Sequence, residues 1–135
     1  LAAESTGLMA AMLEDAIQYA KVRQQFGQPI MEFQLIREKL AHMQVILDAS
    51  RLLSYRAAWA QDQGMDGKFF AAVAKTYYAD KLVECADLAL QIFGGYGYMK
   101  EYDIERLYRD ARLMPIGGGT SEIQKLIVSS RLIRT

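Results

Sequence analysis

Cysteine, histidine and proline are scarce in this 135-residue chain, which contains one cysteine, one histidine and two prolines. The single cysteine, Cys85, excludes a disulfide within the chain, and the single histidine, His42, leaves no cluster of ligands typical of a zinc site. No run of apolar residues approaches the ~18 that a membrane-spanning helix needs. The sequence therefore predicts a domain with no internal disulfide, no bound metal and no membrane span.

Neither sign of charge is in excess, because sixteen lysines and arginines balance sixteen aspartates and glutamates. A surface that binds nucleic acid normally carries a basic excess, so no nucleic-acid partner is expected. Hydrophobic residues make up 52% of the chain and charged residues 24%, which is too apolar for a disordered segment. The length corresponds to a single domain over residues 1–135. Because the sequence begins at Leu1 within an apparent helix, we expect it to be a fragment of a longer protein.

The apolar residues recur with the spacing of α-helices, and glycine and proline mark the expected helix ends. The pattern predicts a first helix that fails around residues 27–29, where Gly27 and Pro29 stand, and a second of some 30 residues that runs to Gln63–Gly64. A third helix is expected from Asp66 to the glycines after Phe93, a short one from Ile104 to about Leu113, and a last one capped by Thr120, with Ile123, Leu126 and Ile127 facing inward. This arrangement is an all-α fold, an antiparallel four-helix bundle with one extra short helix.

Two residues with reactive side chains are interpreted as structural. Cys85 lies within the apolar stripe of the third helix and has no basic neighbour to activate a thiol, so a packing role is favoured over a nucleophile. His42 lies near the core edge of the second helix, where a structural or surface histidine is favoured over a catalytic base.

Two other features admit two interpretations each. Four tyrosines either fix a glycine-rich turn to the bundle or form a wall for a flat ligand. The triple glycine before Thr120 is either a flexible connection or a phosphate site at a helix N-terminus, although it lacks the lysine of a P-loop. The tyrosines are Tyr96, Tyr98, Tyr102 and Tyr108, and the glycines are Gly117, Gly118 and Gly119.

Three segments, in the same order along the chain, resemble motifs of the acyl-CoA dehydrogenases. They are RQQFGQPI with the following FQ (residues 23–34), QIFGGYGY (91–98), and YRDAR with the following GTSEIQ (108–124). The chain thus resembles the C-terminal helical domain of these flavoenzymes. The resemblance implies FAD as cofactor, an acyl-CoA substrate, electron-transfer flavoprotein or a similar acceptor, and a homodimer or homotetramer. It favours a bacterial cytoplasmic enzyme, with the mitochondrial matrix as the alternative.

The resemblance also implies which residues contact the cofactor. Positions matching Arg23, Gln25 and Phe26 reach the FAD of a neighbouring subunit, with the arginine directed at its pyrophosphate. Thr120 and Glu122 match positions beside the FAD of their own subunit. An anionic diphosphate suits a guanidinium, and close approach to the backbone suits glycine. Further FAD contacts match Phe33, Gln34, Gln91, Gly94 and Gly95, and substrate contacts match Gly118 and Gly119.

The implied reaction is the α,β-dehydrogenation of an acyl-CoA thioester, in which a carboxylate removes the α proton while a hydride passes to the flavin. Many family members carry this glutamate in the loop, at the position that matches Gly118, which has no side chain. Glu122 matches a flavin-side position instead. Long-chain and isovaleryl-type members place the base on the first helix of this domain, at a position that falls four residues before Leu1; Glu4 lies about two turns beyond that position.

No catalytic residue is therefore assigned to this chain, which is expected to be inactive alone. The alternative is a family relative without dehydrogenase activity that acts as a binding or structural helical module.

Overall fold

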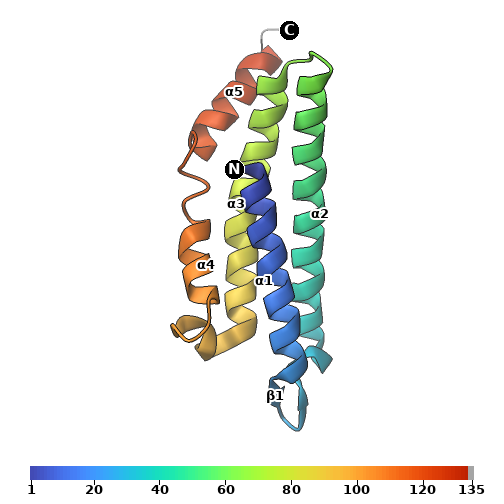
Figure 1. Ribbon diagram of the computed structural model, residues 1–135, viewed down its shortest axis with the longest axis vertical. Helices are drawn as coiled ribbons and strands as arrows, with labels where there is room; N and C mark the ends of the chain where they lie inside the picture. Colours follow the sequence, from blue (N-terminus) through green and yellow to red (C-terminus); the bar gives the residue numbers. More distant parts are fainter. Residues whose placement is uncertain (134–135) are drawn as a thin grey trace.

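The structure, a computed structural model, describes residues 1–133 and contains five α-helices there. The long helices α1 (Ala2–Val22), α2 (Gln34–Asp62) and α3 (Gly67–Phe93) run side by side in alternating directions (Figure 1). Two shorter helices, α4 (Ile104–Ala111) and α5 (Ser121–Ile133), follow one another along α3 and together form the fourth column. The all-α prediction is confirmed, and the fourth helix of the bundle is divided in two. The last two residues of the expected 1–135 domain lie outside the described part.

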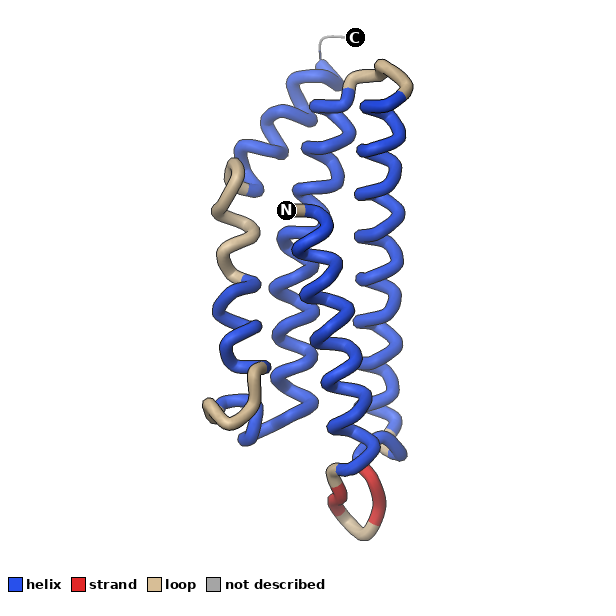
Figure 2. The backbone as a smooth tube through the Cα atoms, viewed as in Figure 1, coloured by secondary structure: helices blue, strands red, loops and turns tan. Residues whose placement is uncertain are grey.

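The end of α1 differs from the prediction. The helix ends at Val22, and a small antiparallel hairpin of β1 (Gln24–Gln25) and β2 (Gln28–Pro29) follows it (Figure 2). The two residues at its tip, Phe26 and Gly27, have φ values of 52° and 81°, the left-handed pair that a type I′ turn requires. The first helix was expected to continue to this turn. The prediction was wrong because Phe-Gly does not signal such a turn as Asn-Gly does.

The other helix boundaries follow local chemistry as predicted. The Asp66 carboxylate accepts a hydrogen bond from the Phe69 backbone N–H at 3.3 Å and caps α3. The Thr120 hydroxyl accepts one from the Ile123 N–H at 3.3 Å and caps α5. Two short 3₁₀ helices, η1 (Ile30–Glu32) and η2 (Gly94–Tyr98), connect the hairpin to α2 and α3 to α4.

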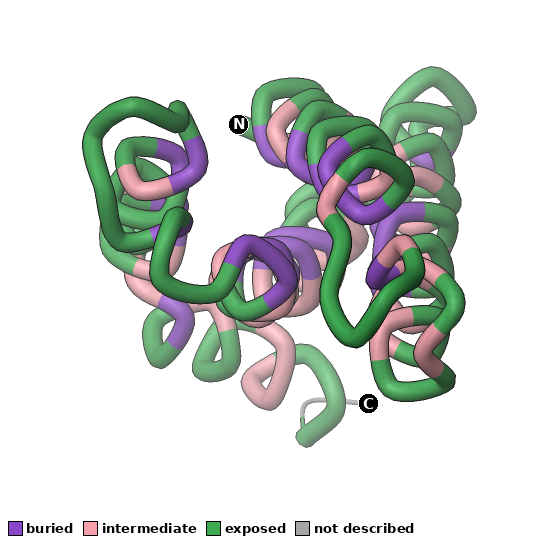
Figure 3. The backbone as a smooth tube through the Cα atoms, turned by 90° about the horizontal axis from the view of Figure 1, so that it is seen from below, coloured by how far each residue is buried: buried purple, intermediate pink, exposed green. Residues whose placement is uncertain are grey.

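The hydrophobic core lies between α1, α2 and α3, whose buried residues face one another when the bundle is viewed from its end (Figure 3). Each fully buried large apolar side chain contributes about 1.5–3 kcal/mol relative to exposure. Cys85 lies in this core, and burial raises the pKa of its thiol to about 12, so its predicted packing role is confirmed. The largest fully buried side chains include Met9, Met12, Met43, Ile46 and Leu82. No helix within residues 1–133 is both long and apolar enough to cross a bilayer.

The predicted inward face of α5 is wrong. Ile123 and Leu126 are 49% and 63% exposed, and Ile127 is exposed as well. The helix packs on α3 through other residues: Ser121 is buried, and Val128 and neighbouring side chains line a groove along α3. A stripe with helical spacing shows that a helix has an apolar face, but it does not show which surface that face meets.

A polar contact links α2 to α3. His42 Nε2 lies 2.6 Å from Glu84 Oε1, and Lys81 Nζ donates to Glu84 Oε2 at 2.6 Å. The hydrogen bonds from Lys81 and then His42 lower the pKa of the Glu84 carboxyl below its usual value of 4.5. His42 is therefore part of an inter-helix contact, in line with its predicted structural role.

Replacing Glu84 by glutamine is expected to lower the free energy of unfolding by less than about 1 kcal/mol at pH 7, because these partly exposed charges are screened by water. The folded-state pKa lies below the unfolded one, so the contribution is complete above the unfolded value and disappears as the pH falls through the folded value. Thermal melts of the wild type and E84Q at pH 7 and at about pH 3 test this. Glu38→Gln, an exposed carboxylate of α2, is the control. An E84Q deficit that is equally large at both pH values contradicts the prediction.

Candidate functional site

Four of the predicted cofactor residues come together at the end of the bundle where α1 and α3 finish. Arg23 and Gln25, after α1, and Gly94 and Gly95, after α3, line one open pocket of about 720 Å³. We call it the Arg23 pocket. Its remaining lining is mainly apolar and aromatic, from Tyr19, Ile30, Ile36, Ile92, Phe93, Tyr96 and Met99. Segments about 70 residues apart in sequence thus form one concave surface with few polar groups, as is usual for small-molecule sites.

Glycine gives the Arg23 pocket its bare backbone. Gly94 ends α3 with φ 60° and ψ −136°, a conformation that residues with a side chain rarely adopt. A Cβ at Gly97 would lie 2.7 Å from the Leu90 carbonyl oxygen, so only glycine allows η2 to pack back on the last turn of α3. By contrast, a Cβ at Gly94 or Gly95 would meet nothing within 4 Å. The peptide groups at these two positions therefore remain open to a ligand.

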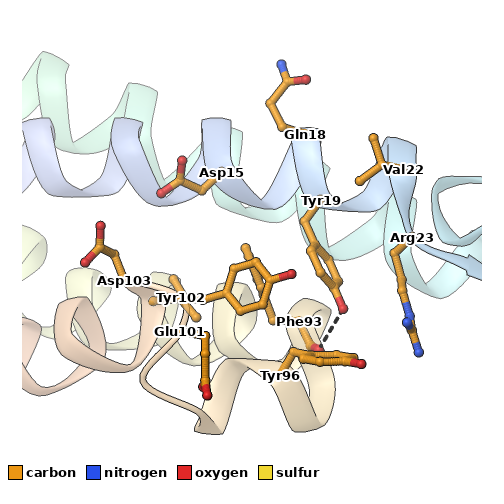
Figure 4. A pocket seen from close by; sticks show the side chains of 11 residues that line it. Asp15, Gln18, Tyr19, Val22, Arg23, Phe93, Tyr96, Glu101, Tyr102 and Asp103 are labelled. Carbon is orange, nitrogen blue, oxygen red and sulfur yellow. Dashed lines mark hydrogen bonds between the residues drawn. The ribbon is translucent and has the colours of Figure 1, made fainter.

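Aromatic rings hold the Arg23 guanidinium at the mouth of the pocket. Its Cζ lies 5.1 Å from the centroid of the Tyr96 ring, and the two side chains are seen together in Figure 4. Tyr96 in turn rests on a cluster in which Tyr19 stacks on Phe93 at 4.2 Å and Tyr102 packs edge-on against both. Within residues 1–133 no carboxylate forms an ion pair with Arg23. Its guanidinium N–H groups are therefore available to an anionic ligand.

A second pocket, of about 690 Å³, lies on the other side of Arg23 and Tyr96. Asp15, Glu101 and Asp103 line it (Figure 4), and burial, followed by the charge of Asp103, raises the pKa of the Asp15 carboxyl. An acidic lining repels phosphate. A diphosphate therefore suits the Arg23 pocket and not this one.

The tyrosines divide between the two interpretations given above. Tyr96 and Tyr102 fix η2 and the following turn against Tyr19 and Phe93. Tyr96 also lines both pockets, so it is part of a wall as well. Tyr98 is 86% exposed and contributes to neither.

The hairpin tip projects an unsupported ring. Phe26 is 92% exposed, and its ring makes a T-shaped contact with Phe33 at 6.1 Å between centroids. A phenylalanine with φ 52° is strained, and strain of this kind is concentrated at functional positions. Gln34 and Gln91, also predicted as cofactor residues, are exposed at the same end of the bundle.

The remaining predicted site residues lie far from the Arg23 pocket. Thr120 is the last of residues 115–120, which we call the glycine loop, and Glu122 lies just after it. A Cβ at Gly118 would overlap Cδ1 of Leu1, which places this loop beside the start of α1. Since α1 has 21 residues, it separates Leu1 from Arg23 by ~30 Å. The structure therefore brings the predicted residues together in two groups, one at each end of α1.

The glycine loop has a defined shape. Gly118 and Gly119 have φ values of 67° and 92°, which strongly favour glycine. The Ser121 N–H donates to the Pro115 carbonyl at 2.9 Å and closes the loop, and the Gln124 amide donates to the Gly118 carbonyl at 3.2 Å. These hydrogen bonds argue against the flexible connection that was one interpretation of the triple glycine, and the other interpretation, a phosphate site, stays a prediction. The backbone N–H of Glu122 and the Thr120 hydroxyl lower the pKa of the exposed Glu122 carboxyl.

Sequence reasoning missed two contributions to these sites. Tyr19 lies four residues before Arg23, a helical spacing that places the two on the same side of the chain, and both line the Arg23 pocket. Lys75, in an apolar part of α3, donates to the Met114 carbonyl beneath the glycine loop. No local pattern links two residues so far apart in sequence.

A comparison with known families gives a decisive match. The family model described as acyl-CoA dehydrogenase, C-terminal domain, matches residues 1–133 of the sequence. The chain belongs to this family. It is 45% identical over 134 residues to the 3-(aryl)acrylate reductase of Clostridium sporogenes and 42% identical to the caffeyl-CoA reductase-Etf complex subunit CarC of Acetobacterium woodii. Each alignment covers 99% of this chain but only 36% and 35% of the relative, so the acyl-CoA dehydrogenase domain described here spans about a third of their length.

Solved structures of the family share the fold of this acyl-CoA dehydrogenase domain. Butyryl-CoA dehydrogenase from Megasphaera elsdenii superposes with a TM-score of 0.94 at 41% identity, over 98% of this chain and 34% of that one. The FAD complex of PigA superposes with a TM-score of 0.93 at 36% identity, again over 98% and 34%. The helical arrangement and the divided fourth column are therefore those of the C-terminal domain in flavin-containing relatives.

Proposed function

We propose that this domain forms part of an FAD-dependent acyl-CoA dehydrogenase, and that the whole polypeptide removes hydrogens from the α and β carbons of an acyl-CoA thioester. The observation that carries the proposal is the Arg23 pocket. A guanidinium with no acidic partner among residues 1–133 lies beside the bare peptides of Gly94 and Gly95. A diphosphate requires hydrogen-bond donors of fixed geometry, such as the N–H groups of a guanidinium, next to accessible backbone N–H groups.

The donor set of the domain fits FAD. When bound, FAD supplies the acceptor for the hydride. Arg23 would bind the pyrophosphate, and the hairpin and η2 would surround it. The second group, Thr120 and Glu122, would lie beside a flavin. Residues proposed for the first group are Arg23, Gln25, Phe26, Phe33, Gln34, Gln91, Gly94 and Gly95.

The separation of the two groups supports an oligomer. At ~30 Å, the length of α1, it exceeds the reach of one extended dinucleotide. Each domain would therefore contact two FAD molecules, one of its own subunit and one of a neighbour. A homodimer or a homotetramer satisfies this arrangement.

The position of Gly118 supports a base that precedes this chain. Gly118 has no side chain to remove a proton, and it lies against Leu1 at the start of α1. A residue one helical turn before Leu1 would lie on the same face of this helix as Leu1 and would approach the loop from the side opposite α3. We propose that this residue, the fourth before Leu1, is the carboxylate base, and that Gly118 and Gly119 make room for the acyl chain.

The acceptor and the compartment are part of the same proposal. Electron-transfer flavoprotein or a similar protein would reoxidise the flavin, which is supported by the relative named as a subunit of a reductase-Etf complex. The bacterial cytoplasm is proposed as the location, with the mitochondrial matrix as the alternative. Because two relatives are named as reductases, the test must follow the reaction in both directions.

The test uses the whole purified polypeptide that carries this domain. We expect FAD at one per subunit and bleaching of its absorbance on addition of acyl-CoA thioesters of graded length and branching. Replacing the fourth residue before Leu1 by the corresponding amide is expected to keep FAD bound and abolish bleaching. The absence of FAD, or full activity with no carboxylate at that position, contradicts the proposal and favours a helical binding module. The 135-residue chain alone is expected to show no turnover.

A further inference from the structure

Lys75 is a charged side chain in a buried position. It is 5% exposed, and its Nζ donates to the Met114 carbonyl oxygen at 2.5 Å. Burial lowers the pKa of its ammonium group, while the charge of Asp80 acts in the opposite direction. A leucine or methionine would fill the same space without the cost of removing an ammonium from water. Packing alone therefore does not explain a lysine at this position. The hydrogen bond to the Met114 carbonyl does explain it.

A second polar side chain of α3 holds the other side of the glycine loop. Asp80 Oδ1 accepts a hydrogen bond from the Ser121 hydroxyl at 2.7 Å, and Oδ2 lies 3.7 Å from Lys125 Nζ. Ser121 is buried, and its N–H closes the loop by donating to the Pro115 carbonyl. Met114 precedes the glycine loop and Ser121 follows it, so α3 fixes both ends.

The same lysine lies directly beneath the middle of the loop. Its Cε is 3.9 Å from the place that a Cβ of Gly118 would occupy, and Leu1 covers that place from the α1 side. Gly118 is thus enclosed between α3 and the start of α1. A loop with two left-handed glycines has many alternative conformations when free, so a single one requires anchors.

We propose that Lys75 and Asp80 are positioning residues, which hold the glycine loop against the start of α1 and thereby place Gly118 at the acyl thioester and Thr120 at the flavin. The inference rests on the proposed function for the ligands that face the loop. The anchoring itself does not depend on the proposed function, because the Lys75–Met114 and Asp80–Ser121 contacts both lie within the chain.

The test compares Lys75→Met with Lys81→Met in the whole FAD-containing protein. Lys81 lies on the same helix, but it is paired with Glu84 on the side that faces α2. We expect Lys75→Met to retain FAD, to lose on the order of tenfold or more in kcat with acyl-CoA, and to melt within a few degrees of the wild type. The backbone amides of Gly117 and Ser121, which donate to the Leu113 and Pro115 carbonyls, should exchange with deuterium faster. Lys81→Met should change neither kcat nor the exchange of these amides. Lys75→Arg, which keeps a charged donor, should restore part of the protection.

Hydrogen exchange separates this inference from the proposed function. If the wild type neither holds FAD nor acts on acyl-CoA, the proposed function fails, and exchange still reports on the loop. Wild-type protection of the Gly117 and Ser121 amides in Lys75→Met overturns the inference, and so does faster exchange with unchanged kcat. If Lys75→Met does not fold, Asp80→Leu replaces it, with Asp80→Asn as the variant that keeps the acceptor. Faster exchange of residues 120–123 in Asp80→Leu but not in Asp80→Asn supports the inference. Equal exchange in the two variants overturns it.

Discussion

Alanine at position 23 is expected to release most of the FAD from the whole protein during purification. Arg23 stands over Tyr96 with no carboxylate paired to it in the described residues 1–133, so the substitution breaks no internal contact except the ring contact. Hydrogen bonds between charged groups each contribute about 1.5–3 kcal/mol. Loss of one or two of them weakens FAD binding roughly 10- to 10,000-fold. The flavin-to-protein absorbance ratio after gel filtration measures the effect, and titration of the apoprotein with FAD gives the dissociation constant.

Two further variants define the role of the Arg23 side chain. Arg23→Lys keeps the charge but loses the planar fork, so FAD binding should be intermediate. Arg51→Ala removes a partly exposed arginine of α2 that lines neither pocket beside Arg23, so it should leave the flavin content unchanged. If Arg23→Ala retains the same flavin content as Arg51→Ala, the assignment of Arg23 to the pyrophosphate is wrong.

Asparagine in place of Phe26 is expected to stabilise the domain and weaken FAD binding. Phe26 has φ 52°, which costs an ordinary residue roughly 1–2 kcal/mol, whereas asparagine adopts this conformation readily and Asn-Gly is the preferred type I′ pair. The gain should raise Tm by several degrees. The phenylalanine ring is 92% exposed, so its removal opens no cavity in this chain. Under the proposed function this ring contacts the neighbouring subunit and its FAD, so its removal weakens FAD binding.

Leucine at position 26 separates strain from the loss of the ring. Phe26→Leu keeps an apolar side chain at the same φ, so Tm should not rise while FAD binding falls part of the way. Differential scanning calorimetry and FAD titration of the three proteins test both effects. An Asn variant with lower Tm shows that the turn is not strained by Phe26. One with wild-type FAD affinity shows that the ring has no part in the site.

Local sequence signals predicted most of the helices because helix periodicity and capping depend on neighbouring residues. Asp66 and Thr120 cap α3 and α5 through their own side chains, and the sequence alone indicates both. The hairpin at residues 24–29 was missed because a strained Phe-Gly turn has no usual signature. The outward face of α5 was missed because the apolar spacing of Ile123 and Leu126 is the same whichever surface they meet.

The sequence supplied candidate site residues one by one, but it did not supply their layout. The family resemblance named Arg23, Gln25, Gly94 and Gly95, and the structure brings these four into one pocket. The separation of this group from Thr120 follows from the length and direction of α1, which become clear only once the helices are packed. The anchoring of the glycine loop by Lys75 depends on a contact 39 residues away along the chain, and sequence spacing carries no information about it.

A structure of the whole protein with FAD bound tests the central claim most directly, which is that the two ends of α1 serve two different cofactors. We predict the pyrophosphate of a neighbouring subunit's FAD at the Arg23 guanidinium and the backbone of Gly94 and Gly95, and a second FAD, that of the domain's own subunit, beside Thr120. An Arg23 pocket filled by protein side chains, or one FAD in contact with both Arg23 and Thr120, would contradict it.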